Sequence, residues 1–329
     1  MKIVRFLRLL SLGVIACSVF CASHRNRQQL RQQIETTLHI SVPLPAPHGK
    51  SYVPFTPAPG VAADRVSYAT AYGMRVPAIV YHQAGATIER HPALIVVNRP
   101  SDDKSSWYDS WAGILYAGAG AVVLTYDPIG EYERNKDRLS GAVQYSWSGA
   151  MGRRLAGLMV SDILQAANYL SHRSDVDPKR IAVLGSSGSF AALLACAVDT
   201  QVRACMLGGG SELFATLDKQ AAAQLSSSKN VLNYSGRQPY FLSKPAALWL
   251  EKKLKFRNWT GKKIQAMPET QKAGTTVLGA NIPSVPRDEL YAVPKVVWQF
   301  QKNNYTYESW LARAKAAIAH GQGATANAH

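Results

Sequence analysis

The stretch of sequence that decides the fold is Arg180-Ile181-Ala182-Val183-Leu184-Gly185-Ser186-Ser187-Gly188-Ser189. The run at 180–184, apolar from Ile181 onward, predicts a buried strand, and the residues from Phe190 to Ala197 predict a helix directly after the loop. A strand that turns sharply into a helix through small residues is the setting of a nucleophile elbow. We therefore expect Ser187 to project from the carboxyl edge of a parallel sheet, close to the positive end of a helix dipole.

Strands and helices alternate regularly on both sides of this stretch. Apolar runs at 93–97, 121–126 and 202–207 predict buried strands, and helical spacing at 106–119 and 155–170 predicts helices between them. This rhythm is typical of parallel βαβ units with right-handed crossovers. Residues 65–70 and 75–81 predict two further strands joined by a turn at Tyr72-Gly73. The fold class expected is α/β, a mostly parallel sheet with helices on both faces and antiparallel strands at its N-terminal side.

The regular alternation stops after Leu207. Residues 211–239 are small and polar, 245–256 predict an amphipathic helix, 261–300 are irregular, and 305–319 predict a helix. We therefore expect a shortened C-terminal half that lacks a strand. The division expected is a signal peptide at 1–23, a polar helix and proline-rich strap at 24–60, the α/β domain at 61–260 and a C-terminal extension at 261–329.

The first residues have the pattern of an export signal. Three cations, Lys2, Arg5 and Arg8, come before an apolar run at 9–16 that is too short to span a bilayer. Val14-Ile15-Ala16-Cys17 also resembles a bacterial lipobox, in which the Cys carries lipid; ordinary cleavage near residues 22–23 is the alternative. We expect an exported protein, in the periplasm, at the outer surface or secreted, with a membrane tether if Cys17 is lipidated.

The charge balance is strongly basic, with 37 Lys and Arg against 21 Asp and Glu and a formal net charge of +16. Such a balance suits anionic polysaccharide or lipid headgroups, although by itself it names no function. No nucleic-acid-reading motif is present, so we expect no nucleic-acid partner. The cysteines outside the signal region, Cys196 and Cys205, have no CxxC or CxxH spacing, and we expect two small buried side chains without a disulfide.

Three further segments, together with the elbow, resemble a known family: Asn98-Arg99-Pro100, the run from Tyr126 to Arg134, and the run from Asp175 to Arg180. They are similar to those of bacterial α/β-hydrolases related to acetyl xylan esterase and dienelactone hydrolase. The resemblance implies an exported serine hydrolase that cleaves small-molecule or carbohydrate esters through a Ser187 acyl-enzyme. The sequence has no nucleotide-binding motif and no metal-ligand cluster, so we expect no cofactor and no metal. The Gly188 amide would be one oxyanion-hole donor, and Asn98 or Arg99 the other, because Pro100 has no N–H.

The sequence departs from the family at the general base. An α/β-hydrolase triad runs Ser, Asp or Glu, then His, yet the chain has no His between Ser187 and residue 319. Arg237 stands where the resemblance places the His, and a guanidinium cannot act as a base near neutral pH. His320 is the candidate base and Glu212 the candidate acid. The alternative is a catalytically impaired relative with a binding or structural role.

Other candidate pocket residues surround the elbow: Ser186, Trp107, Tyr108 and Asp127. We expect Asp127, at the end of its strand, to brace the neighbouring loops with Arg134 as its partner, and residues 102–104 to cover the pocket. Among the histidines that precede the nucleophile, we interpret three as surface or packing residues: His82, His91 and His172.

Overall fold

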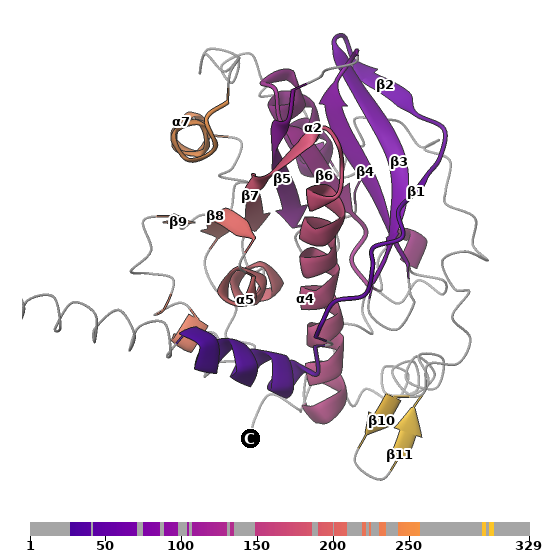
Figure 1. Ribbon diagram of the computed structural model, residues 1–329, viewed down its shortest axis with the longest axis vertical. Coiled ribbons are helices and arrows are strands. Elements are labelled where there is room, and N and C mark those ends of the chain that lie inside the picture. Colours follow the sequence, from indigo (N-terminus) through magenta and orange to yellow (C-terminus); the bar gives the residue numbers. More distant parts are fainter. Residues whose placement is uncertain are drawn as a thin grey trace, which may run out of the picture.

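The computed structural model describes residues 27–40, 42–70, 75–85, 89–97, 104, 107–129, 132–134, 149–185, 190–199, 201–208, 219–221, 224, 230–234, 243–256, 298–300 and 303–305. The described part contains a nine-stranded sheet with helices packed on both faces, and a separate two-stranded sheet (Figure 1). Among the described residues, no helix is both long and apolar enough to cross a bilayer.

The large sheet is antiparallel on one side and parallel on the other. Its strand order is β1-β3-β4-β6-β5-β7-β8-β9, and β2 also pairs with β3. The antiparallel side comprises β1 (Lys50–Ser51), β2 (Phe55–Ala58), β3 (Val61–Ala69) and β4 (Arg75–Gln83). The parallel side comprises β5 (His91–Val97), β6 (Val122–Tyr126), β7 (Val176–Gly185), β8 (Val202–Gly208) and β9 (Val231–Tyr234). β4 pairs antiparallel with β6 and so joins the two sides.

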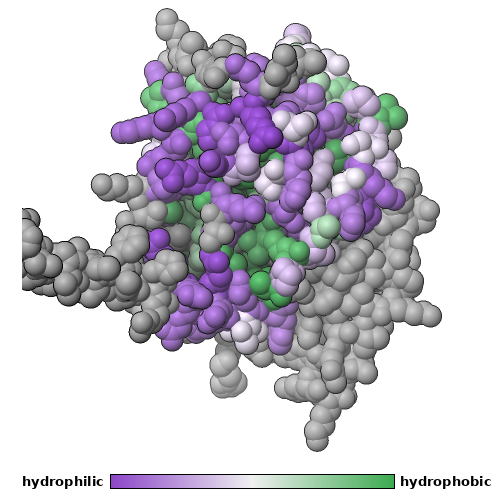
Figure 2. Space-filling view, viewed as in Figure 1, coloured by the Kyte–Doolittle hydropathy of each residue, from purple (hydrophilic) through white to green (hydrophobic). Residues whose placement is uncertain are grey.

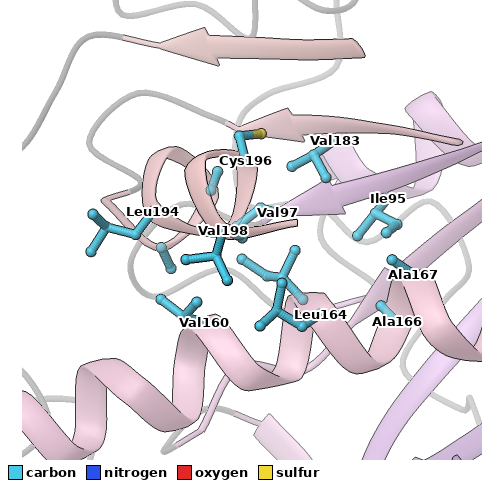
Figure 3. Close-up of a cluster of buried hydrophobic side chains, with 14 of the residues drawn as sticks. Ile95, Val97, Val160, Leu164, Ala166, Ala167, Val183, Leu194, Cys196 and Val198 are labelled. Carbon is cyan, nitrogen blue, oxygen red and sulfur yellow. The ribbon is translucent and has the colours of Figure 1, made fainter. Parts of the chain in front are cut away.

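Both faces of the parallel strands are buried, because successive side chains point to opposite faces. Ile95 and Val183 lie in one core with α4 (Gly149–Ser171) and α5 (Phe190–Val198), as Figure 3 shows. Leu94 and Leu184 lie in the other core with α2 (Trp107–Gly118) and α7 (Lys244–Leu254). This two-sided burial explains why these strands appear in the sequence as continuous apolar runs. The predicted α/β class is confirmed.

An N-terminal helix at 27–38 packs on the α4 and α5 side of the sheet (Figure 1). Its buried side chains Leu30, Ile34 and Leu38 share one face, as their four-residue spacing predicts. The Leu38 carbonyl lies where a side chain at Gly157 would be, so only glycine fits at that point of α4. On the face of the molecule seen in Figure 1, hydrophilic side chains surround a central hydrophobic area (Figure 2).

The proline-rich segment after this helix lies against α4. Gln165 and Asn168 both donate side-chain hydrogen bonds to the Pro45 carbonyl, at 2.9 and 3.3 Å. The same segment then supplies β1 and β2, which pair with β3. The expected strap is therefore partly a set of short sheet strands.

One expectation for the region after the elbow is wrong: the cysteines are not unpaired, because Cys196 on α5 and Cys205 on β8 form a disulfide with a Cα–Cα distance of 6.5 Å. The shortened C-terminal half also contains a strand that was not predicted, β9, which pairs parallel with β8 and extends the sheet. A small antiparallel pair, β10 (Trp298–Phe300) and β11 (Asn303–Tyr305), lies in the C-terminal region. The helix predicted at 305–319 lies outside the described residues after Tyr305.

Candidate active site

The carboxyl ends of the parallel strands lie at one edge of the sheet. Val97 on β5 pairs with Gly185 on β7, Gly185 pairs with Leu207 on β8, and Gly208 pairs with Tyr234 on β9. In open α/β sheets, ligands bind in the crevice outside these ends. The edge is therefore the place in this fold where a catalytic site is expected, and β7 ends there at Gly185.

The two flanks of the elbow are closely packed. β7 ends at Gly185 and α5 begins at Phe190. A Cβ at Gly185 would lie 2.6 Å from the Cβ of Ala192, so only glycine lets α5 cross the strand end this closely. The Tyr234 hydroxyl donates a buried hydrogen bond of 3.0 Å to the Gly185 carbonyl. Strand, short loop and helix thus follow one another as the elbow pattern requires.

The predicted catalytic residues themselves lie outside the described part of the chain: Ser186, Ser187, Gly188, Asn98, Arg99, Glu212 and His320. Trp107 and Tyr108 form the first turn of α2, and the structure describes their backbone only. The roles of these residues remain predictions from the sequence. The described residues establish the framework around them.

A buried ionic cluster lies beside this edge and was not foreseen. The Lys104 ammonium is 2.6 Å from Asp127 Oδ2 and 2.6 Å from Glu133 Oε1, and the three side chains are 2%, 0% and 6% exposed. The Lys104 amide also donates to Asp127 Oδ1, and its carbonyl accepts from Thr125 Oγ1. Burial disfavours the charged ammonium, but the charges and hydrogen bonds of the two carboxylates outweigh it and raise the pKa of Lys104.

Lys104 therefore does not lie on an exposed covering loop. Its contacts hold the chain after β5 against the residues that follow β6. Residues 98–103, which include both candidate oxyanion donors, lie between the anchored end of β5 and this anchored lysine. The polar run 102–106 predicts surface exposure, so sequence reasoning missed the burial of Lys104.

The expected partnership between Asp127 and Arg134 differs from the one observed. Arg134 donates to the backbone carbonyl of Asp127 at 3.2 Å, and its guanidinium pairs with the buried carboxylate of Asp162 on α4. Thr70 Oγ1 donates to the same carboxylate at 2.8 Å. Burial raises the pKa of Asp162, although Arg134 and Thr70 stabilise its charged form. The Asp127 carboxylate is instead neutralised by Lys104.

His82, His91 and His172 lie away from the elbow. His91 begins β5 and Val97 ends it, and at about 3.3 Å per residue the two are about 20 Å apart. His82 lies near the end of β4, beyond the pairing of Tyr81 with the start of β6, and His172 directly follows α4. A general base must come within hydrogen-bond reach of its nucleophile, and these histidines lie at the other edge of the sheet from Gly185, where β7 ends.

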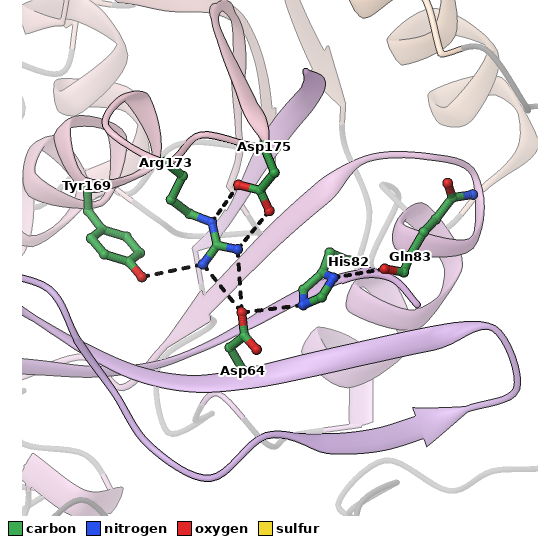
Figure 4. A network of polar contacts seen from close by, with 6 residues as sticks. All are labelled: Asp64, His82, Gln83, Tyr169, Arg173 and Asp175. Carbon is green, nitrogen blue, oxygen red and sulfur yellow. Dashed lines mark hydrogen bonds and ion pairs between the residues drawn. The ribbon is translucent and has the colours of Figure 1, made fainter. Parts of the chain in front are cut away.

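His82 belongs instead to a polar network at the amino edge (Figure 4). Its Nε2 is 3.3 Å from Asp64 Oδ2, and its Nδ1 is 2.9 Å from the Gln83 carbonyl. Arg173 binds both Asp175 oxygens, at 2.9 and 2.7 Å, and lies 3.4 Å from Asp64. This network joins β3 and β4 to the end of α4, and its role in the fold is structural.

The strand order and the passage from β7 through a short loop into α5 define an α/β-hydrolase-like fold. No protein-family profile matches the sequence, and no curated protein matches it.

Solved structures with a similar fold include several esterases. One, from Bacteroides fragilis and assigned as an acetyl xylan esterase, is 12% identical, with 64% of this chain and 74% of that chain covered and a TM-score of 0.49. A cold-adapted esterase from an Arctic intertidal metagenomic library is 14% identical, with coverages of 64% and 100% and a TM-score of 0.48. A methylesterase is 14% identical, with coverages of 90% and 77% and a TM-score of 0.48.

Proposed function

We propose that the protein is a serine hydrolase acting on carboxylic esters, with Ser187 as its nucleophile. The observation that carries the proposal is the place of Ser187 in the chain, two residues after the end of β7 at Gly185 and three before the start of α5 at Phe190. The close packing of Gly185 against Ala192 supports a sharp turn between strand and helix at this point. A serine in such a turn is exposed at the sheet edge where substrates bind.

In the proposed reaction, Ser187 Oγ attacks the acyl carbonyl carbon and its proton passes to a general base. The carbonyl oxygen becomes an oxyanion, stabilised by the Gly188 amide and a donor at Asn98 or Arg99. The ester C–O bond then breaks and the alcohol leaves with the proton. Water attacks the acyl-enzyme in the same way, releasing the carboxylic acid and restoring Ser187. The base we propose is His320, with Glu212 as its acid partner.

The Lys104 cluster supports the proposal because an oxyanion hole must be held rigidly to act without reorganisation. Asn98 directly follows Val97, the buried last residue of β5. Five residues after Arg99 comes Lys104, which Asp127 and Glu133 hold in place. The described residues on either side of Asn98 and Arg99, Val97 and Lys104, are therefore both fixed.

We propose further that the protein is exported. The disulfide between Cys196 and Cys205 supports this, because disulfides persist in oxidising compartments and are rare in the cytosol. The same proposal includes lipidation of Cys17 as the tether. Mass spectrometry of the mature N-terminus tests it: a lipidated Cys17 supports the tether, and an N-terminus near residues 22–23 supports ordinary cleavage. Retention of the unprocessed chain in the cytosol would contradict export.

Turnover of p-nitrophenyl acetate tests the hydrolase proposal. We expect Ser187→Ala to abolish turnover and His320→Ala to reduce it by at least 100-fold, since general-base catalysis contributes about 10²–10⁴-fold. Ser189→Ala is the matched control, because it removes a hydroxyl from the same loop at the position where the elbow motif has glycine. Equal turnover by the wild-type and Ser187→Ala proteins would contradict the proposal.

The second candidate is a catalytically impaired relative that binds without hydrolysis. It is favoured by the positions of His82, His91 and His172, all remote from the elbow. A folded wild-type protein without Ser187-dependent turnover of acetyl or longer acyl esters would support this alternative over the first.

A further inference from the structure

A cavity lies at the opposite end of the parallel strands from the elbow. Its volume is about 490 Å³, and it lies between the N-terminal helix, the end of α5 and the first residues of β8 and β9. Figure 1 shows the N-terminal helix beside α5 in this region. The cavity wall includes the disulfide between Cys196 and Cys205, which ties α5 to β8. The candidate active site makes no use of this cavity.

Three arginines line the cavity and come from two elements that are distant in sequence. Arg27 and Arg31 are four residues apart on the N-terminal helix and therefore lie on the same side of it. Arg203 is the second residue of β8. The Nε atom of Arg31 is buried and has no hydrogen-bond partner within the described part of the chain. Buried N–H donors are nearly always hydrogen-bonded, so the Arg31 guanidinium favours a ligand that supplies the acceptor.

Among the described residues that line the cavity, Asp199 supplies the one carboxylate. It accepts a hydrogen bond of 2.5 Å from the Gln201 amide, so part of its acceptor capacity is already used. Burial raises the pKa of Asp199, although hydrogen bonds from the backbone amides of Gln201 and Val202 and the charge of Arg31 oppose this shift. The remaining polar side chains, Gln28, Gln224 and Asn230, are neutral. Positive charge therefore dominates the lining.

We propose that this cavity is a binding site for a phosphate-class oxyanion, held by Arg27, Arg31 and Arg203. The planar guanidinium group binds two oxygens of such an anion at once and is suited to phosphoryl recognition. The phosphoryl group is either that of a soluble phosphate ester or that of an anionic lipid headgroup. Arg27 lies ten residues after Cys17, so a lipid on Cys17 would hold the cavity within about 35 Å of a membrane.

Thermal unfolding of the full chain in inorganic phosphate, against chloride at matched ionic strength, tests the site. We expect phosphate to raise the Tm of the wild-type protein, because a ligand that binds only the folded state stabilises it. Arg31→Gln and Arg203→Gln should each weaken phosphate binding at least tenfold. Arg203 is exposed, so its substitution leaves the core intact. Arg90→Gln, an exposed arginine outside the cavity, is the charge-matched control and should bind as the wild type does.

Equal Tm values in phosphate and chloride would overturn the proposal, as would an equal phosphate effect in the wild-type, Arg31→Gln and Arg203→Gln proteins. Vesicles of phosphatidylglycerol or phosphatidylcholine then distinguish the sources, with Cys17→Ser in every protein to remove the tether. A headgroup site predicts sedimentation with phosphatidylglycerol that falls in Arg31→Gln but not in Arg90→Gln. If the ligand is instead a soluble phosphate ester, the wild-type protein should bind phosphate. The wild-type, Arg31→Gln and Arg90→Gln proteins should then sediment equally with phosphatidylglycerol vesicles.

Discussion

The Tyr234 hydroxyl on β9 donates a hydrogen bond of 3.0 Å to the Gly185 carbonyl on β7, two strands away in the sheet. The bond is buried, and it fixes the residue directly before the elbow from the side of the last strand. β9 therefore does more than lengthen the sheet, because its final residue holds Gly185, two residues before Ser187 in the chain.

Replacing Tyr234 with Phe tests this support. The ring is kept, but the Gly185 carbonyl loses a buried donor, and the free energy of unfolding should fall by about 1–3 kcal/mol. Urea denaturation followed by tryptophan fluorescence measures the change. A loss below about 0.5 kcal/mol would mean that the Tyr234 hydroxyl does not stabilise the elbow.

The Gly185→Ala variant tests the close crossing of β7 and α5. The added Cβ would lie 2.6 Å from the Ala192 Cβ, and relieving this overlap should cost about 1–3 kcal/mol of stability. Gly118→Ala is the matched control, since a Cβ there meets nothing within 4 Å. We expect this control to be neutral or to raise stability by up to about 1 kcal/mol. Equal unfolding midpoints for the two variants would contradict the packing described for the elbow.

Lys104→Met tests the buried ionic cluster. The variant keeps much of the side-chain volume but leaves Asp127 and Glu133 without their shared counter-charge, so we expect a loss of about 3–5 kcal/mol. The exposed Lys252→Met on α7 should change stability by less than about 0.5 kcal/mol. Equilibrium unfolding in urea compares the two. If the Lys104 variant is as stable as the Lys252 variant, the cluster is not a structural anchor.

The network around His82 predicts a pH dependence of stability. The neighbouring Asp64 carboxylate raises the pKa of His82 despite partial burial, so the folded protein binds this proton more tightly than the unfolded chain. The resulting stabilisation is fully present below about pH 6.5, the unfolded value, and is lost as the pH rises through the raised folded pKa.

Unfolding in urea between pH 5.5 and 8.5 measures this dependence. His82 also lowers the pKa of Asp64, whose own contribution is lost only in acid as the pH falls through that lowered value. His82→Gln and Asp64→Asn should therefore both flatten the decline in stability above pH 6.5. An unchanged decline in both variants would show that the pair does not carry it.

The sequence predicts the central architecture well because the parallel strands are buried on both faces. Short apolar runs such as 93–97 and 181–184, rich in β-branched residues and bounded by turn residues, favour buried strands over helices, and β5 and β7 include them. The helix Leu155–Leu170 was equally clear, because its apolar residues repeat with helical spacing along α4.

The strand β9 could not be predicted in the same way. Val231–Tyr234 has only four residues and lies within a polar stretch, so it shows no periodicity. The disulfide was missed because spacing in sequence does not give the distance between Cys196 and Cys205, which the packing of α5 on β8 determines.

The candidate site was predicted from motif and context, and its supporting residues were not. Lys104, Glu133 and Asp162 are charged residues in positions that sequence reasoning assigns to the surface or to a polar helix face. Only the tertiary fold shows that the Lys104 ammonium lies between two carboxylates and that the Asp162 carboxylate pairs with the Arg134 guanidinium.

The most direct test of the proposed function is covalent labelling of the folded full chain with a fluorophosphonate probe, followed by peptide mass spectrometry. Ser187 Oγ should form a bond to phosphorus as fluoride leaves, and the adduct should map to Ser187. We predict that the adduct is absent from Ser187→Ala and retained in Ser189→Ala. A folded wild-type protein that carries no adduct on Ser187 would contradict the assignment of this residue as the nucleophile.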